Sequence, residues 1–197
     1  RDYKIERIIS SPIEHSCVFN TVNRMGTENI EVQFVQLDQY GRADLDHLKE
    51  LLEHSDKKTL VSLMHANNEV GTLNPIDKIG SMCTEHNALF HTDTVQSIGH
   101  IPIDVSTVNI NFLSGSGHKL HGPKGVGFLY VNKQNCIDAY IDGGGQERQV
   151  RSGTENVASI IGLGKAVEQA ILHIDEYRLK IDAIRSYFIK QLKDNYP

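Results

Sequence analysis

The length and composition of the chain exclude several classes of protein. Its 197 residues are 39% hydrophobic and 23% charged, which is enough to bury a core and excludes a mainly disordered chain. The formal net charge of −5 disfavours nucleic acid as a partner, because binding phosphates needs a basic face. No apolar run approaches the roughly 20 residues that cross a bilayer, and the start has no signal-peptide character, so we expect no membrane contact. Three cysteines make a disulfide scaffold improbable and predict a cytoplasmic location.

Segments with strand character alternate with segments of helical spacing along the chain. In chain order we expect a strand at 5–9, a helix at 13–24, strands at 31–37 and 59–64 around a helix at 44–53, a helix at 75–87, and strands at 88–91, 110–113 and 126–131. Such alternation is typical of βαβ units. It predicts an α/β fold in which a mostly parallel sheet has helices on both faces.

The C-terminal part has a different pattern. From residue 155 onward, apolar residues recur at steps of three and four, which predicts one helix of about 40 residues, roughly 60 Å long. Such a helix cannot lie wholly against a domain of this size, so we expect it to reach another domain or subunit. A coiled coil is the alternative, and Gly162 and Gly164 disfavour it. We therefore divide the chain into a domain at 1–155 and a long helix at 156–197.

Polar clusters follow three of the predicted strands. HANNE follows TLVSLM, HTDTVQ follows ALF, and SGSGHK follows INFL. Because parallel strands end at the same edge of a sheet, and ligands bind outside that edge, these clusters predict a ligand site.

The densest cluster is the glycine-rich loop at 114–125. It is not a Walker A loop, because Pro123 stands where that motif has Lys, and it is not G-x-G-x-x-G, because Leu120 occupies the last glycine position. What remains is Lys119 in a loop of small and polar residues. A lysine shielded from water becomes a nucleophile for carbonyl groups. On local composition alone, an ordinary surface turn is the simpler interpretation.

Asp93 stands at a predicted strand end. A carboxylate there can hold a protonated ring nitrogen, as pyridoxal phosphate requires. A metal site built from His91, Asp93, His118 and His121 is the alternative. Cys83 and His86 lack the second pair of ligands that a structural zinc needs, so we expect no structural metal.

Three further candidates each have a functional and a structural interpretation. Asn68 could donate to a phenolate or carbonyl oxygen, or belong to a turn that leaves the sheet. His15 could stack on a flat ring or shuttle protons, although a lone histidine is usually structural. In the loop at 143–156, Arg148, Arg151 and Thr154 could contact an anion, or Thr154 could cap the following helix.

Together these segments resemble the cysteine desulfurases, pyridoxal phosphate enzymes of the class-V aminotransferase group. The matching runs are SPIEH, HANNEVG, HTDTVQSIGHIPID, SGSGHKLHGPKGVGFLY and GGGQERQVRSGTEN. They occur in family order and cover most of residues 8–165. The resemblance implies an incomplete large domain of a fold-type I pyridoxal phosphate enzyme, from the branch that supplies sulfur for iron–sulfur clusters.

The resemblance also implies roles for individual residues. Lys119 would hold pyridoxal 5′-phosphate covalently and serve as a base, and Asp93 would pair with its ring nitrogen. His15 would stack on the ring and assist proton transfer. Asn68 and Gln96 would lie beside the phenolic oxygen of the cofactor.

The remaining implied roles concern the phosphate and the partners. Ser116 and His118 would contact the phosphate, and Thr154 would reach the phosphate of a neighbouring subunit, which implies a homodimer. The implied reaction converts L-cysteine to L-alanine, and its sulfur passes through an enzyme persulfide to an acceptor such as an iron–sulfur scaffold protein.

The chain departs from the family in length. Members are about twice as long, which, with the first residue Arg1, predicts that this is a central piece of a longer protein. Cys17, Cys83 and Cys136 do not match the persulfide cysteine of the family, so we expect this chain to be inactive alone. The alternatives are a selenocysteine lyase, another class-V enzyme, a non-catalytic scaffold, and a metal hydrolase.

Overall fold

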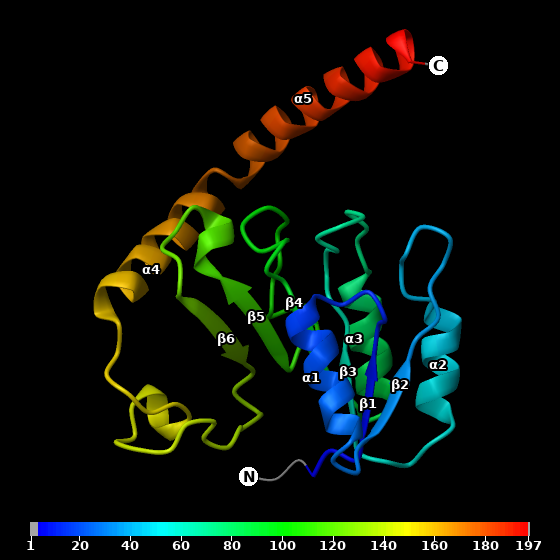
Figure 1. The fold of residues 1–197 in the computed structure, drawn as a ribbon, viewed down its shortest axis with the longest axis vertical. Helices are drawn as coiled ribbons and strands as arrows, with labels where there is room; N and C mark the ends of the chain where they lie inside the picture. The colour runs from blue at the N-terminus through cyan, green and yellow to red at the C-terminus, as the bar shows by residue number, and fades with distance from the viewer. Residues whose placement is uncertain (1–3, 197) are drawn as a thin grey trace.

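A central sheet organises the protein, as seen in a computed structural model that describes residues 4–196 (Figure 1). Its six strands have the order β2-β1-β3-β4-β5-β6; β1 to β5 are parallel and β6 is antiparallel to β5. The strands are β1 (Arg7–Ser10), β2 (Glu31–Phe34), β3 (Thr59–Ser62), β4 (Leu89–Asp93), β5 (Phe112–Ser116) and β6 (Gly127–Val131). The predicted α/β fold with a mostly parallel sheet is confirmed.

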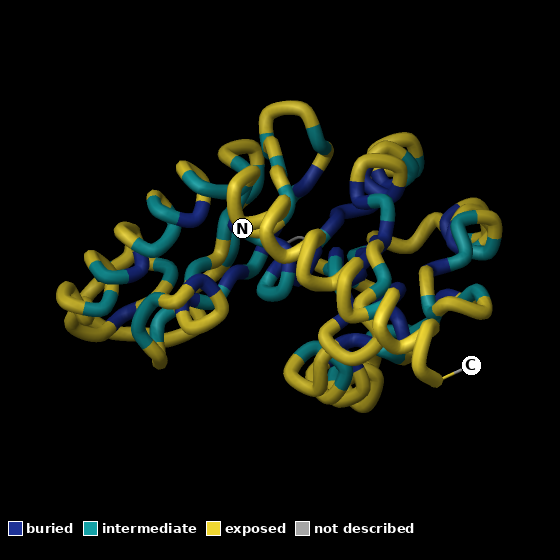
Figure 2. Tube along the Cα trace, turned by 90° about the horizontal axis from the view of Figure 1, so that it is seen from above, coloured by how far each residue is buried: buried dark blue, intermediate teal, exposed yellow. Residues whose placement is uncertain are grey.

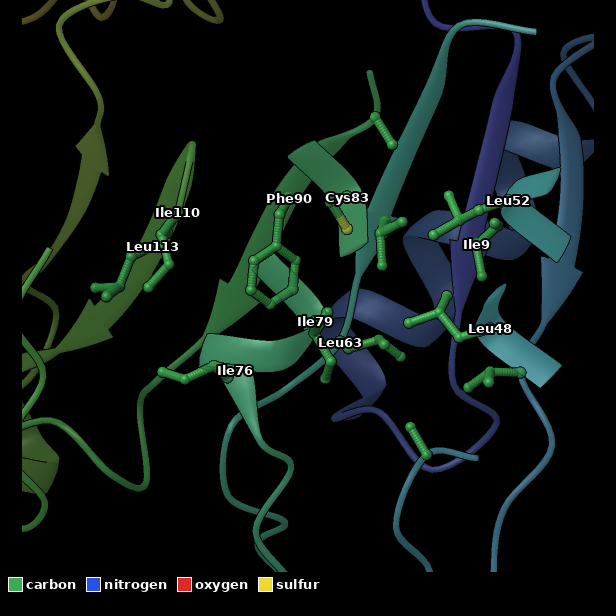
Figure 3. Close-up of a cluster of buried hydrophobic side chains, with 14 residues drawn as sticks. Ile9, Leu48, Leu52, Leu63, Ile76, Ile79, Cys83, Phe90, Ile110 and Leu113 are labelled. Atoms are coloured by element: carbon green, nitrogen blue, oxygen red, sulfur yellow. The ribbon is translucent and has the colours of Figure 1, made fainter. Parts of the chain in front are cut away.

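Helices cover both faces of the sheet. The helices are α1 (Ser16–Gly26), α2 (Leu45–Glu53), α3 (Ile76–Glu85), α4 (Val157–Leu172) and α5 (Ile174–Asn195), with 3-10 turns η1 (Gly117–Leu120) and η2 (Glu147–Gln149). Figure 3 shows the main core, where side chains of β1, β3, β4 and β5 meet those of α2 and α3. On the opposite face α1 packs on β2, where the rings of Phe19 and Phe34 lie 5.6 Å apart.

A buried arginine ties the α2 side of the sheet together. Arg7 is 2% exposed. Its guanidinium donates to the Thr59 hydroxyl at 2.9 Å and to the Leu51 carbonyl at 2.7 Å. These bonds join β1 to β3 and to the end of α2, so the buried positive charge donates to neutral oxygens.

The boundaries of one predicted strand are corrected. The predicted strand at 110–113 is shifted, since β5 runs from Phe112 to Ser116 and so includes the start of the glycine-rich loop. The cause is pairing with β6, which extends to Ser116. A side chain at Gly115 would overlap the ring of Phe128, so only glycine allows this close approach.

The prediction of one long C-terminal helix is wrong. The chain forms α4 and α5, bent by 69° at a break, where His173 has non-helical dihedrals of φ −111° and ψ 14°. Asp175 and Glu176 occupy the first turn of α5, where negative charge favours the start of a new helix. The apolar spacing continues across the break, so periodicity alone does not reveal it. The division at 155/156 stays a prediction.

The two C-terminal helices differ in burial. α4 buries Leu163 and Ala170, whereas α5 buries none of its residues and is exposed along its length (Figure 2). No single helix in residues 4–196 is long and apolar enough to span a membrane, although α4 and α5 pass that test as a bent pair.

Candidate active site

The carboxyl ends of four neighbouring parallel strands bring the predicted site residues to one edge of the sheet. The strands β1, β3, β4 and β5 are adjacent in that order (Figure 1). His15 lies beyond the end of β1, Asn68 beyond β3, Asp93 at the end of β4, and Lys119 beyond β5. The predicted convergence at this edge is therefore confirmed, while the role of each residue stays a prediction.

A pocket of about 320 Å³ opens at this edge between two loops. It is lined by 13–16, which follow β1, and by 67–70, which follow β3. His15 lies in this lining and caps α1, where its Nδ1 accepts the backbone N–H of Cys17 at 3.3 Å. The exposed ring is therefore held by the first turn of the helix.

Glu14 is a buried acid that the sequence analysis missed. It is 7% exposed and lines the same pocket. Its Oε1 accepts the backbone N–H of Met64 at 2.8 Å, and its Oε2 is buried without a partner among residues 4–196. Burial raises the pKa of Glu14 to about 8; the Met64 hydrogen bond opposes this shift and the Asp93 carboxylate adds to it. Nothing in the pattern around SPIEH indicates that this glutamate is buried.

Asp93 is the last residue of β4 and is 7% exposed. Its Oδ1 accepts the N–H of Val95 at 2.8 Å, which orients the carboxylate at the turn after the strand. Gln96 lies half-buried in the same turn. A carboxylate with so little water around it suits a role as a fixed counter-charge for a cation.

His91 lies on the same face of β4, two residues before Asp93. Its ring contacts the hydroxyls of Ser62, at 2.9 Å from Nδ1, and Ser114, at 3.3 Å from Nε2. Burial lowers the pKa of His91, with Asp93 opposing the shift. Both ring nitrogens thus contact hydroxyls of the neighbouring strands β3 and β5, which leaves His91 poorly placed as a metal ligand.

The loop that carries Lys119 is closed on itself. The backbone N–H groups of His121 and Gly122 both donate to the Gly117 carbonyl, and His121 takes the left-handed conformation with φ 60°. Lys119 is exposed, and its amine has no hydrogen bond or ion pair within residues 4–196. Beside it, Ser116 Oγ lies 2.8 Å from His118 Nδ1.

Small residues of α4 hold this loop from outside. A Cβ added at Gly162 would lie 2.7 Å from Pro123 Cγ, and one added at Gly122 would lie 3.1 Å from the Cβ of Ala166. Further along α4, the Cβ of Ala170 is the close neighbour, since a Cβ added at Gly99 would lie 2.8 Å from it. α4 can approach the lysine loop only because these positions are small.

The two asparagines of the HANNE segment differ: the turn interpretation is confirmed for Asn67, and a ligand contact by Asn68 stays a prediction. Asn67 closes the turn, since its Oδ1 accepts the N–H groups of Glu69 and Val70 at 2.8 and 2.9 Å. Its Nδ2 donates to the Ile13 carbonyl at 2.8 Å and so joins the two loops of the pocket. Asn68 is exposed, bonded to Glu69 at 2.7 Å, and so is open to a ligand.

Thr154 does not follow any of these four strands. It is exposed, on the segment between the antiparallel edge strand β6 and α4. The alternative in which Thr154 caps α4 is wrong, because Asn156 is the cap and its Oδ1 accepts the Ser159 N–H at 3.3 Å. Asparagine is at least as good a cap as threonine and lies next to the first helical residue.

The proposed metal ligands are not gathered. Within residues 4–196, no group of three or more His, Cys, Asp or Glu side chains is arranged to hold a metal ion. Cys83 is 1% exposed in the core, and burial raises the pKa of its thiol to about 12. A thiol that is so hard to ionise does not favour metal binding.

The comparison with protein families decides the assignment. Residues 4–196 match the family model for aminotransferase class-V. The chain belongs to the class-V aminotransferase family. Enzymes of this family depend on pyridoxal phosphate.

Several relatives have known names. The chain is 43% identical to the cysteine desulfurase IscS of Dictyoglomus turgidum, over 96% of this chain and 48% of that protein. It is 45% identical to the IscS of Methanosarcina thermophila, over 96% of this chain and 46% of that protein. The chain thus spans about half the length of the curated relatives it matches.

Solved structures agree with this class-V fold. The NifS-like protein of Rickettsia africae superposes with a TM-score of 0.91 at 38% identity, covering 99% of this chain and 53% of that one. A structure of SspA in complex with cysteine gives a TM-score of 0.79 at 40% identity, covering 84% of this chain and 48% of that one.

We expect Gly162→Ala to loosen the lysine loop. The new methyl group meets Pro123, so α4 must shift, which costs about 1–3 kcal/mol of unfolding free energy. Gly164→Ala is the matched control, since nothing lies within 4 Å of its Cβ and alanine favours the helix by about 0.5–1 kcal/mol. Chemical denaturation of both variants measures the difference. Equal stabilities would contradict the close packing of α4 on the loop.

We expect Glu14→Gln to change how stability depends on pH. Because the folded-state pKa of about 8 exceeds that of the unfolded chain, wild-type stability falls as pH rises from about 4.5 to 8. Glutamine cannot ionise, so the variant should gain about 2–4 kcal/mol over wild type between pH 5 and 8.5. Urea denaturation across this range measures the effect, with Glu28→Gln, at an exposed position, as the control. Parallel pH profiles for Glu14→Gln and wild type would rule out a buried neutral acid.

Proposed function

We propose that the protein to which this chain belongs is a pyridoxal phosphate-dependent cysteine desulfurase. The observation that carries the proposal is the convergence of Lys119, Asp93, His15 and Asn68 at one edge of four adjacent parallel strands. The class-V family membership and the relatives named cysteine desulfurase support it. The proposed reaction converts L-cysteine to L-alanine and passes its sulfur to an enzyme cysteine as a persulfide.

The side chains at this edge suit the cofactor. The structure offers an amine on Lys119 that has no partner among residues 4–196, a carboxylate with little exposure on Asp93, and a hydroxyl next to an imidazole at Ser116 and His118. These groups match an aldehyde, a protonated ring nitrogen and a phosphate, respectively. We propose that Asn68 and Gln96 lie beside the phenolic oxygen. When bound, pyridoxal phosphate supplies an electron sink that stabilises negative charge at the substrate Cα.

The chain's own residues then control protons. Asp93 would keep the ring nitrogen of the cofactor protonated, since a carboxylate favours the cationic form of a nearby nitrogen. Lys119 would serve as the base that removes the proton from the substrate Cα. His15 presents a flat ring for stacking at the mouth of the pocket. The low exposure of Asp93 and Glu14 keeps water from weakening these interactions.

Thr154 fits a site that two subunits share. Its exposed position after the edge strand β6 leaves it accessible to the phosphate bound by a second copy. We therefore propose a homodimer in which each Thr154 serves the neighbour's site. We further propose a cytoplasmic location and an iron–sulfur scaffold protein as the sulfur acceptor.

A selenocysteine lyase, or another class-V enzyme, is the second candidate. It would use the same edge of the sheet and differ in which substrate is accepted. The names of the relatives at 43–45% identity favour the desulfurase.

We expect the purified chain, incubated with pyridoxal phosphate and reduced with borohydride, to carry one adduct at Lys119. Peptide mass mapping locates the adduct. Asp93→Ala should lower its yield about tenfold or more, because the ring nitrogen loses its counter-charge. Lys124→Ala is the matched control in the same loop and should leave the yield unchanged. Adducts scattered over several lysines, or none at Lys119, would contradict a cofactor site on this chain.

We expect L-cysteine to compete with Lys119 for the bound cofactor. Preincubation of the loaded chain with L-cysteine should lower the borohydride adduct at Lys119 several-fold, and D-cysteine should do so less. The same titration with L-selenocysteine and L-alanine tests the second candidate. Protection by L-selenocysteine at a tenfold lower concentration would favour the lyase. Equal protection by all amino acids would contradict a site selective for cysteine.

A further inference from the structure

The first turn of α1 constrains which nitrogen of His15 carries a proton. The backbone N–H of Cys17 donates to His15 Nδ1 at 3.3 Å, and this bond caps the helix. A ring nitrogen that accepts a hydrogen bond carries no hydrogen of its own. In the neutral imidazole the proton must then lie on Nε2.

The thiol of Cys17 meets the same nitrogen. Its Sγ lies 3.0 Å from His15 Nδ1. Since Nδ1 carries no hydrogen, the contact is favourable only if the thiol is protonated and donates its S–H. The surroundings keep the thiol protonated, because burial raises its pKa and the Asp93 carboxylate adds to the shift. Cys17 therefore supplies two donors, one from its backbone and one from its side chain, to one acceptor.

We propose that Cys17 is a positioning residue that holds His15 in the tautomer with its proton on Nε2. The backbone N–H would be present with any non-proline residue at this position, whereas the second donor depends on the side chain. A side chain that cannot donate would leave only the weaker of the two contacts. The side chain at position 17 then determines which tautomer of His15 is favoured.

The consequence for catalysis rests on the proposed function. With Nδ1 occupied by two donors, His15 has no free acceptor and one donor, Nε2–H. At the cofactor site the ring can stack and can donate a hydrogen bond or a proton from Nε2. It cannot act as a base through Nδ1 unless the capping bond of α1 breaks, which would also loosen the start of the helix.

The proposal is tested by determining the tautomer of His15 directly, in the chain without cofactor. Long-range ¹H–¹⁵N correlation spectra of ¹⁵N-labelled protein at about pH 8 distinguish the two neutral tautomers. The His15→Asn variant assigns the His15 signals among the 10 histidines. We expect the Nε2–H pattern in wild type and in Cys17→Ser, whose hydroxyl still donates. Cys17→Ala should shift the ratio toward Nδ1–H by about two- to tenfold, the loss of one hydrogen bond.

Two results would overturn the proposal. One is an Nδ1–H pattern in wild type, and the other is a spectrum of Cys17→Ala identical to that of wild type. Cys17 is exposed, so we expect all variants to fold, and circular dichroism checks this. Borohydride labelling of Lys119 in the same samples tests the proposed function separately. Labelling without the tautomer shift would overturn only this inference, and the tautomer shift without labelling would overturn only the cofactor site.

Discussion

The parallel pairing of β1, β3, β4 and β5 is the constraint on which the rest of the structure depends. Each of these strands ends at the same edge of the sheet, so residues far apart in sequence meet there, and hydrogen bonds between the loops after β1 and β3 add to this arrangement. The hydrogen bonds of the ladder continue past the ends of the strands. The N–H of His65 donates to the Asp93 carbonyl, and that of Thr94 donates to the Ser114 carbonyl. The register of the sheet thus fixes the spacing of the groups that would hold a cofactor.

Two ionisable side chains at this edge favour their neutral forms. Desolvation disfavours the charged forms of the buried Glu14 and the half-buried His91, so both favour the neutral state near neutral pH. With Glu14 and His91 neutral, Asp93 is the buried carboxylate best placed to oppose a cation. A second ionised carboxylate beside it would repel it and so make both charges less favourable. A neutral Glu14 still accepts the Met64 N–H and so still joins the loop after β1 to the loop after β3.

The sequence predicted what strand periodicity and local motifs can encode. The βαβ order, the helix expected at 44–53 and the edge at which Lys119, Asp93, His15 and Asn68 meet follow from short-range patterns. The burial of Glu14 and the break at His173 do not. The first depends on contacts distant in sequence, and the second on a change of backbone dihedrals at one residue that leaves the apolar spacing unchanged. The close approach of α4 to the lysine loop also escaped prediction, because Gly162 by itself indicates only a weak helix former.

Asp93 and His15 are both oriented by hydrogen bonds at the point where a strand ends or a helix begins. Asn67 closes the turn and leaves Asn68 exposed. Asp93 itself caps the turn after β4 through Val95, and His15 caps α1. Their orientation is therefore set by backbone hydrogen bonds that form when the chain folds, before any ligand binds. Binding then costs little ordering of side chains. Function and stability are coupled at His15, because a substitution there removes the side-chain cap of α1 as well as the ring of the candidate site.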